Sequence, residues 1–401
     1  MPLGNRRTVG KKSAPLTPRR NLPGFMTEGG QPFVTSSWTF SLAAFATGLT
    51  LSAASALLVR RWSITRGFVD VPGGHKGHDA PVALGGGIAI TLAVLLPMIA
   101  AVSAANLLVG RPPSWLPGEV LVHLDGVVSK NFVASGIMIA ALTMCILGLA
   151  DDARPMHPRA KLLGQFLIAL FLVMACDLRL MSHLPYWLSV LLSLLWILTL
   201  TNSFNFLDNM DGLASGVGMI AAAVFAMTAM NAGQLFVPVC CWLLAGALAG
   251  FLPLNFHPAR MYMGDAGSLV IGMLLAVFTI LTTFASPSQG QRPFGVLAPL
   301  VVMAVPLYDT ASVVFVRWRL GVPVWAGDRR HFSHRLVRRG MSVPRAVLVI
   351  WLATLVTSMP ALLLPGASWP LAWGVVIQTL LVVTLVALLE TGGPRDAVDG
   401  K

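Results

Sequence analysis

The chain has 401 residues, of which 56% are hydrophobic and only 11% are charged, and its mean hydropathy is +0.76. Soluble domains carry about 25% charged residues, so this composition excludes a disordered chain, a disulfide scaffold and an ordinary soluble globule. It predicts an all-α polytopic membrane protein. The net charge of +12 would suggest nucleic acid on a soluble domain. Here the basic residues flank apolar segments, so we expect membrane orientation and no nucleic-acid partner.

About eleven apolar segments approach the length of roughly 20 residues that a bilayer-spanning helix needs. We expect them at residues 38–59, 83–109, 132–150, 161–176, 185–201, 212–231, 235–254, 267–285, 295–316, 346–364 and 369–389. The chain then divides into a basic N-terminal tail over 1–37, expected to be disordered, a transmembrane domain over 38–389 and a short C-terminal tail over 390–401.

The distribution of basic residues predicts which ends of the segments face the cytoplasm. When the loops alternate between two sides, 18 of the 28 Lys and Arg residues fall on one side, and the loops of the other side carry four, Arg111, Lys130, Arg179 and Arg292. The positive-inside rule places the richer side in the cytoplasm. The basic N-terminal tail falls on the opposite side. A miscounted span, a tail too far from the membrane to matter and a start of translation at Met26 are the three explanations left open.

Acidic residues gather on the predicted cytoplasmic side, in loops or at helix ends, with Asp309 about two turns inside a span. Carboxylates near hydrocarbon are costly and are usually functional. Clustered carboxylates repel one another unless a cation neutralises them, and oxygen-only ligands favour magnesium or manganese over zinc. We therefore expect a divalent-metal site. The nine acids are Asp70, Asp79, Asp151, Asp152, Asp208, Asp211, Asp265, Asp309 and Asp328.

The first polar segments lie at the mouths of the second and fourth spans. Lys76 precedes a glycine run at 85–87, which would let backbone approach a ligand or pack two helices closely. Asp151 and Asp152 end the third span, and the short loop that follows returns Lys161 to the same rim. There Lys161 can bind phosphate, the alternative being a solvated helix end with a salt bridge.

The third segment has polar residues every three positions through an apolar stretch. It contains Asn202, Asn205, Asp208 and Asp211. If the segment is helical, Asp208 and Asp211 lie about 60° apart and close enough to share one ligand. A helix cap by Asp211 is the alternative, but it accounts for one of these four residues only.

The last two segments combine helix ends with cationic side chains. Gly264 and Asp265 begin a span, where free backbone N–H groups suit a diphosphate and Asp265 can hold a metal; a cap on a glycine turn is the alternative. His331, His334 and Arg335 share one helical face. That face can clamp phosphate, or instead belong to a basic helix lying on anionic headgroups.

Together these segments resemble the polyprenyl-phosphate N-acetylhexosamine-1-phosphate transferase family over nearly all of 38–389. The run Asp-Arg-Arg-His-Phe-Ser-His-Arg at 328–335 is similar to the bacterial branch that uses UDP-N-acetylglucosamine. The triple-histidine run of the peptidoglycan branch is absent. His75 stands where the resembled branch often has arginine.

The resemblance implies that undecaprenyl phosphate attacks the β-phosphate of a UDP-N-acetylhexosamine at the cytoplasmic face of a bacterial inner membrane, releasing UMP. It implies a metal site of Asp265 and Asp208 for Mg²⁺, with Mn²⁺ as an alternative, and catalytic roles for Asp151, Asp152, Asp208 and Asp211. It implies substrate-binding roles for Lys76, Lys161, Asn202, Asn205, Gly264, His331, His334 and Arg335. The implied product is a lipid-linked precursor of a cell-envelope glycan, and a homodimer is compatible with the family.

Two other functions fit parts of the pattern. A cation-coupled transporter also uses intramembrane carboxylates, but near the bilayer midplane and with internal repeats, whereas all but one of the nine acids lie in loops or at helix ends. A sister transferase with another UDP-amino sugar is the closer alternative.

Overall fold

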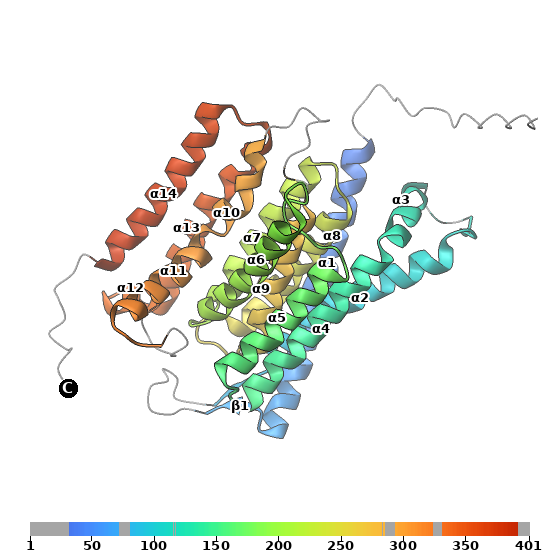
Figure 1. Ribbon diagram of the computed structural model, residues 1–401. Coiled ribbons are helices and arrows are strands. Elements are labelled where there is room, and N and C mark those ends of the chain that lie inside the picture. The colour runs from blue at the N-terminus through green and yellow to red at the C-terminus, as the bar shows by residue number, and fades with distance from the viewer. Residues whose placement is uncertain are drawn as a thin grey trace, which may run out of the picture.

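The computed structural model describes residues 32–71, 81–114, 116, 118–282, 284, 293–323 and 331–391. Helices make up almost all of this part of the chain (Figure 1), which confirms the all-α membrane class. A two-residue strand pair in the loop after the first helix, β1 (Val69–Asp70) and β2 (Val82–Ala83), is antiparallel. These are the only strands among the described residues.

The helices succeed one another with short connections. In chain order they are α1 (Pro32–Arg66), α2 (Gly86–Leu108), α3 (Gly118–Ser129), α4 (Asn131–Ala153), α5 (Pro158–Met174), α6 (Tyr186–Leu207), α7 (Leu213–Asn231), α8 (Phe236–Asn255), α9 (Gly264–Leu281), α10 (Ala298–Val302), α11 (Ala304–Arg319), α12 (Phe332–Arg338), α13 (Val343–Ser358) and α14 (Trp369–Thr391), with 3₁₀ turns η2 (Pro293–Leu297) and η3 (Met359–Gly366).

Nine helices in the described residues are long and apolar enough to cross a membrane. A tenth candidate consists of two pieces, Pro293–Val302 and Ala304–Arg319, bent by 60° at Met303. The remaining segment of the eleven expected is α5, which is helical but has only 17 residues. Each expected span therefore corresponds to helix, and α5 and the bent pair are the two that fall short of a straight, full-length span.

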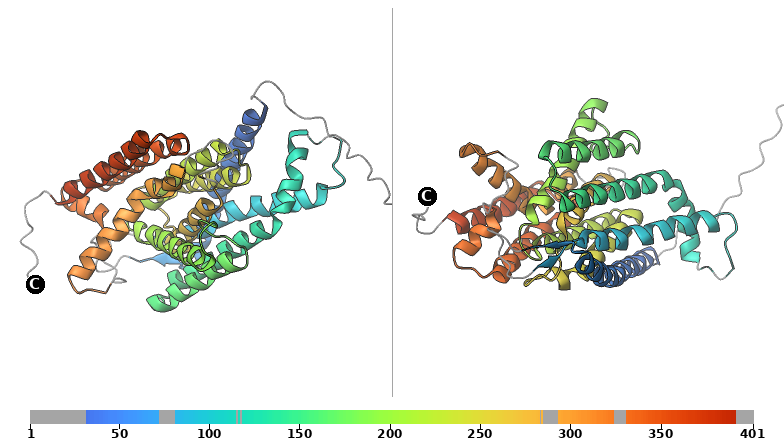
Figure 2. Two further views of the ribbon diagram at one scale, coloured as in Figure 1. Left: turned by 45° about the horizontal axis from the view of Figure 1, so that its top comes forward. Right: turned by 90° about the horizontal axis from the view of Figure 1, so that it is seen from below.

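Helix α9 is the centre of the bundle. It is buried along nearly its whole length and packs against α4, α6 and α2, while α1 lies along α8 and α7 lies beside α8 and α13. The segments from α10 to α14 form a second layer beside α6 and α7 (Figure 2). The four cysteines are free and buried, as expected for packing residues.

Close backbone contacts fix the N-terminus of α9. A Cβ added at Gly87 of α2 would lie 2.1 Å from the amide nitrogen of Gly267, and one added at Gly148 of α4 would lie 2.4 Å from that of Ala266. The amide nitrogens of Gly86 and Gly87 also donate to the carbonyls of the two residues just before α9, at 3.0 and 2.9 Å. The glycine run at 85–87 thus packs helices together.

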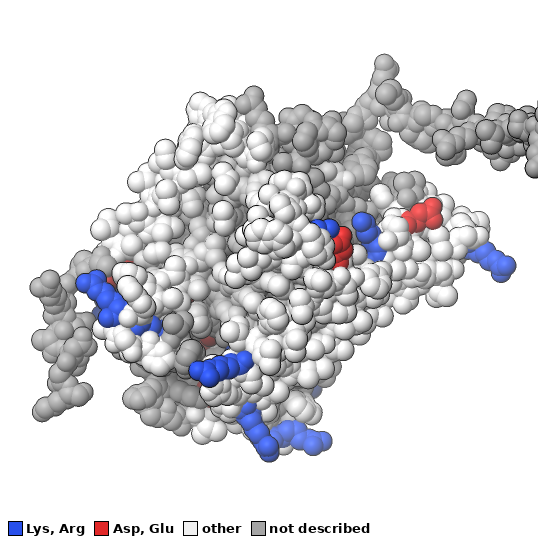
Figure 3. Space-filling model, in the orientation of Figure 1, with Lys and Arg blue, Asp and Glu red and all other residues white. Residues whose placement is uncertain are grey.

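Few charged side chains lie on the middle of the face drawn in Figure 3. In Figure 3 the basic side chains lie mainly along the lower edge and at α12, with a smaller group of both signs toward the opposite end. The broad uncharged surface between them is what a hydrocarbon environment requires. This distribution agrees with acidic segments at the helix ends.

Candidate active site

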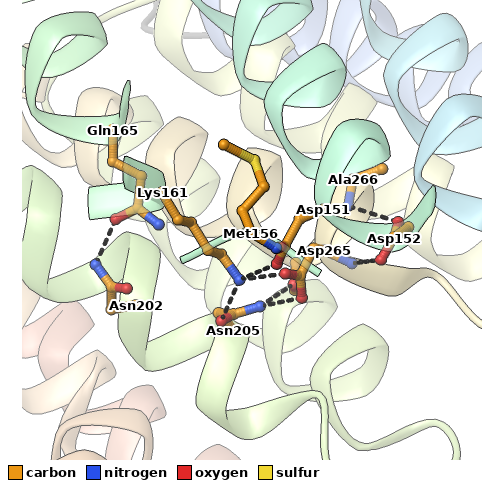
Figure 4. A network of polar contacts seen from close by, with 10 residues as sticks. Asp151, Asp152, Met156, Lys161, Gln165, Asn202, Asn205, Asp265 and Ala266 are labelled. Carbon is orange, nitrogen blue, oxygen red and sulfur yellow. Dashed lines mark hydrogen bonds and ion pairs between the residues drawn. The ribbon is translucent and has the colours of Figure 1, made fainter. Parts of the chain in front are cut away.

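Four helix ends meet at one place. The last turns of α4 and α6 and the first turns of α5 and α9 carry Asp151, Asn205, Lys161 and Asp265, whose polar groups point toward one another (Figure 4). These residues are far apart in the sequence. The packing of α4 and α6 on α9 therefore assembles the acid and amide groups that the sequence analysis expected to share one patch.

Lys161 lies in the middle of this cluster. Its Nζ is 3.0 Å from Oδ2 of Asp151, contacts Oδ2 of Asp265 and is 3.2 Å from Oδ1 of Asn205. The exposed fractions of the Lys161, Asp151 and Asp265 side chains are 16%, 14% and 23%, so the charges are only partly hydrated. The expectation that Lys161 returns to the rim that carries Asp151 is confirmed.

Asn205 and Met156 orient the two carboxylates. The Asn205 amide donates to Oδ1 of Asp265 at 2.6 Å and to the Ser268 hydroxyl at 3.1 Å. The backbone N–H of Met156 donates to Oδ1 of Asp151 at 2.6 Å. Each acid is therefore held by one neutral donor and by the shared cation, and the two carboxyl groups also contact each other.

Asp152 has a different role from its neighbour. Its carboxylate accepts hydrogen bonds from the backbone N–H groups of Asp265, at 2.8 Å, and Ala266, at 3.2 Å. It thus caps α9 from another helix, in the position where a negative charge is favoured by the helix dipole. Free backbone N–H groups were expected at this helix end for a diphosphate, but Asp152 already occupies those of Asp265 and Ala266. Diphosphate binding at this helix end stays a prediction.

Gly264 is required by this cap. Its φ is +67°, and an added Cβ would lie 2.4 Å from Oδ2 of Asp152. A larger residue would therefore be strained and would displace the capping carboxylate. The direct contact of Gly264 is with Asp152, and its expected contact with substrate stays a prediction.

Asp208 and Asp211 diverge because α6 ends between Asn205 and Asp208. Asp208 is the C-cap of α6, and Gly212, at φ +76°, begins α7, so the helical turn expected over 208–211 is wrong. Oδ2 of Asp211 accepts from the backbone N–H of Ala259 at 3.0 Å and lies 2.8 Å from Nδ1 of His257. Asp211 thereby fixes the loop between α8 and α9.

Asp208 keeps its place beside the acid cluster. Burial raises the pKa of the Asp208 carboxyl well above its ordinary value, and the charges of Asp265, Asp152 and Asp211 raise it further. Within the described part of the chain no residue donates a hydrogen bond to this carboxylate. Because a nearby cation would favour its ionised form, the surroundings of Asp208 suit a metal ion.

A second polar layer lies one helical turn further along α5 and α6. The Asn202 amide donates to Oε1 of Gln165 at 2.7 Å and to the Leu198 carbonyl at 2.8 Å (Figure 4). Asn202 therefore links α5 to α6, and its expected contact with the donor stays a prediction. The sequence analysis missed Gln165, although a lone amide four residues after Lys161 in an apolar helix was a signal.

Helix α12 adjoins the end of α6. The Ser333 hydroxyl donates to Oδ1 of Asn209 at 2.5 Å, and the ring of His331 lies 6.0 Å from that of Phe206. Nη2 of Arg335 is 3.1 Å from Oε2 of Glu390 in the last turn of α14, so Arg335 belongs to an ion pair between α12 and α14.

The other expected phosphate-binding residues have separate surroundings. His331 is 5% exposed and lies against the fully buried Asp309. His334 is half-buried on α12. Lys76 lies outside the residues that the structure describes.

The acidic side chains near Lys161 suit a divalent metal only together with a bound substrate. No group of three or more His, Cys, Asp or Glu side chains is preassembled for a metal among the described residues. Mg²⁺, however, is commonly held by one or two carboxylates, with substrate phosphates and water completing its shell. Asp208 and Asp265, whose charges interact, meet that requirement, so the residues present fit Mg²⁺ bound together with a phosphorylated substrate.

Residues 134–283 match the family described as glycosyl transferase family 4. The chain is similar to the decaprenyl-phosphate N-acetylglucosaminephosphotransferase of Mycolicibacterium smegmatis, with 33% identity over 83% of this chain and 85% of the relative. It is 27% identical to the probable undecaprenyl-phosphate N-acetylglucosaminyl 1-phosphate transferase of Bacillus subtilis, over 82% of this chain and 86% of the relative. It is 24% identical to the undecaprenyl-phosphate alpha-N-acetylglucosaminyl 1-phosphate transferase of Escherichia coli K12, over 80% and 82%.

The matched segment runs from α4 to the end of α9 and so contains the Lys161 cluster. The relatives align with four fifths or more of both chains, which extends the likeness beyond that segment. The chain therefore belongs to glycosyl transferase family 4 and, within it, to the polyprenyl-phosphate N-acetylhexosamine-1-phosphate transferases that its sequence resembles.

Proposed function

We propose that the protein transfers N-acetylglucosamine-1-phosphate from UDP-N-acetylglucosamine to undecaprenyl phosphate and releases UMP. The observation that carries the proposal is the Lys161 ammonium held between Asp151, Asn205 and Asp265 at the junction of four helices. A cation and acids at a shared helix rim are the groups that phosphoryl transfer uses. The names of the relatives supply the acceptor and the sugar.

The donor diphosphate would bind at the rim formed by Lys161 and Asn205. Lys161 offers a compact positive charge that can move from the carboxylates to a phosphate oxygen. The Asn205 amide, which donates to Asp265, keeps that carboxylate oriented. His334 and Arg335 on α12, and Lys76, remain further candidates for phosphate binding.

A divalent metal, Mg²⁺ or alternatively Mn²⁺, would be held by Asp265 and Asp208. When bound, it would neutralise charge on the diphosphate as the bond to UMP breaks. The raised pKa of Asp208 supports this assignment, because the surrounding carboxylates disfavour ionisation until a cation is present.

Asp151 is the best candidate for contact with the acceptor phosphate. Asp152 is engaged with the two backbone amides of α9, whereas Asp151 has a single backbone donor and otherwise contacts Lys161 and Asp265 inside the cluster. A phosphate monoester is mostly ionised near pH 7. Direct attack on the β-phosphate therefore needs only an oriented acceptor, and we favour it over a covalent aspartyl intermediate.

We place the site at the cytoplasmic face of a bacterial inner membrane, where a UDP-sugar is supplied. The basic residues at the ends of α1, α5 and α11 support this orientation. The lipid acceptor would reach the site from the bilayer. A homodimer is compatible with this arrangement.

The remaining alternative is the same reaction with another UDP-amino sugar. Purified protein in detergent should release UMP when undecaprenyl phosphate, Mg²⁺ and UDP-N-acetylglucosamine are present together. A panel of UDP-N-acetylhexosamines tests the donor. A higher kcat/KM with another UDP-amino sugar would replace the assigned donor, and no turnover with any of them would contradict the proposed reaction.

A further inference from the structure

Asp309 is a buried acid to which the proposed reaction gives no role. It lies in α11 and has 0% exposure. Its Oδ2 is 2.9 Å from Nδ1 of His331, and its Oδ1 accepts from the backbone N–H of Phe332 at 3.3 Å. Burying a carboxylate is unfavourable unless its oxygens have partners, so both contacts matter for keeping it there.

His331 lies beside the acid cluster. Its ring is 6.0 Å from the ring of Phe206 in the last turn of α6. Two residues further on, Ser333 bonds to Asn209, which directly follows Asp208. The Asp309–His331 pair is therefore connected to the end of α6 that carries the proposed metal ligand.

The chemistry of the pair determines the state of the imidazole. An ionised carboxylate only accepts hydrogen bonds, so Nδ1 of His331 carries the proton that faces Asp309. Within the described part of the chain, Nε2 has no hydrogen-bond partner. A carboxylate at one ring nitrogen fixes the orientation and the tautomer of the ring. When Nε2 also carries a proton, both ring nitrogens are donors, and Nε2–H can donate a charge-assisted hydrogen bond to a phosphate oxygen.

We propose that Asp309 is a positioning residue, which holds His331 with its Nδ1–H on the carboxylate so that Nε2–H of the doubly protonated ring donates to a phosphate of the nucleotide-sugar. This rests on the proposed function. Asp309 itself does not touch the substrate, and it acts through His331.

A purely structural role would be anchoring of α12. That helix has three other side-chain anchors, from Ser333 to Asn209 and from Arg335 to both Glu390 and Ser312. If Asp309 only anchored α12, removing the Ser333 hydroxyl would have a comparable effect. Ser333→Ala is therefore the matched control, since it removes a buried anchor two residues from His331 without changing the imidazole.

The test variant is Asp309→Asn, which keeps the size of the side chain. His331 and Phe332 contact different oxygens of Asp309, and in asparagine one of these positions is an NH₂ group, which donates instead of accepting. The Nδ1-protonated state of His331 should therefore lose population. We expect kcat/KM for UMP release to fall by about 10- to 100-fold, the range typical of a lost partner behind a histidine. Ser333→Ala should stay within about threefold of the wild type, which we take as the limit for a non-specific effect.

Two further measurements separate positioning from damage to the fold. The double variant Asp309→Asn with His331→Ala should be no slower than His331→Ala alone, because effects through one residue are not additive. In ¹⁵N-histidine spectra of the detergent-solubilised protein, the His331 resonances, assigned by their loss in His331→Ala, should report the tautomer change in Asp309→Asn but not in Ser333→Ala.

Three results would overturn the inference: wild-type kcat/KM in Asp309→Asn, an equal loss in Ser333→Ala, or a double variant slower than His331→Ala by the full Asp309→Asn factor. Failure of the proposed function gives a different result. The wild type would then show no turnover with any UDP-sugar, while the ¹⁵N spectra would still show whether Asp309 sets the tautomer of His331.

Discussion

The cap that Asp152 places on α9 can be tested with a pair of glycine substitutions. Gly264 and Gly67 have nearly the same positive φ, +67° and +68°. An added Cβ at Gly264 would lie 2.4 Å from Oδ2 of Asp152, whereas one at Gly67 would have no atom within 4 Å. Gly67→Ala therefore reproduces the backbone strain of Gly264→Ala without its clash.

The expected difference follows from the two hydrogen bonds of Asp152. Both substitutions place alanine in the left-handed region, at about 1–2 kcal/mol. Gly264→Ala also displaces a carboxylate that accepts from Asp265 and Ala266. Hydrogen bonds to charged groups contribute about 1.5–3 kcal/mol each, so losing both adds about 3–6 kcal/mol.

Thermal unfolding in detergent and UMP release measure the two consequences. We expect a lower Tm for Gly264→Ala than for Gly67→Ala and a loss of kcat of about 10²-fold, because Asp265 at the start of α9 is displaced. In an Asp152→Ala background, adding Gly264→Ala should cost no more than Gly67→Ala does. Equal Tm and kcat for Gly264→Ala and Gly67→Ala would refute the capping argument.

Three other substitutions test the site and its scaffold. Asp265→Asn should abolish Mg²⁺-dependent UMP release, because it removes a proposed metal ligand. The variant should still fold, because Asp152 binds the backbone of residue 265 and not its side chain. Full turnover across a Mg²⁺ titration would show that Asp265 is not a metal ligand. Lys161→Met leaves Asp151 and Asp265 without their shared cation, so kcat/KM should fall by about 10²-fold or more. Lys130→Met, at the other end of α4, should leave kcat/KM unchanged. Gly87→Ala places a Cβ 2.1 Å from the amide nitrogen of Gly267 and should lower the Tm. Gly374→Ala is the control, because an added Cβ there has no atom within 4 Å. Equal Tm values for the two variants would contradict the close packing of α2 on α9.

Hydropathy and motif spacing predicted the helices and most of the residues that meet at the site. Each apolar run corresponds to helix in the described residues, because hydrocarbon length and burial dictate composition, although α5 and the bent pair fall short of a straight span. The cost of polar groups in hydrocarbon also explains why acid and amide groups lie at the ends of α4, α6 and α9. Lys161, Asn205 and Asp265 therefore converge as expected.

What the sequence could not predict is the direction in which each side chain turns. Asp151 and Asp152 are adjacent, yet one faces Lys161 and the other caps α9. Asp208 and Asp211 separate because α6 ends at Leu207, a boundary that depends on tertiary packing. Asp309 was recognisable as an acid inside a span, but its partner His331 is 22 residues away, and no local pattern connects them.

The central claim is that the Lys161 cluster transfers a sugar together with its phosphate. The most direct measurement uses UDP-N-acetylglucosamine labelled with ³²P at the β-phosphate, incubated with the purified protein, undecaprenyl phosphate and Mg²⁺. The label should move into the organic-soluble lipid fraction while unlabelled UMP stays in the aqueous phase. Label that remains aqueous as UDP, with the sugar alone on the lipid, would contradict the account.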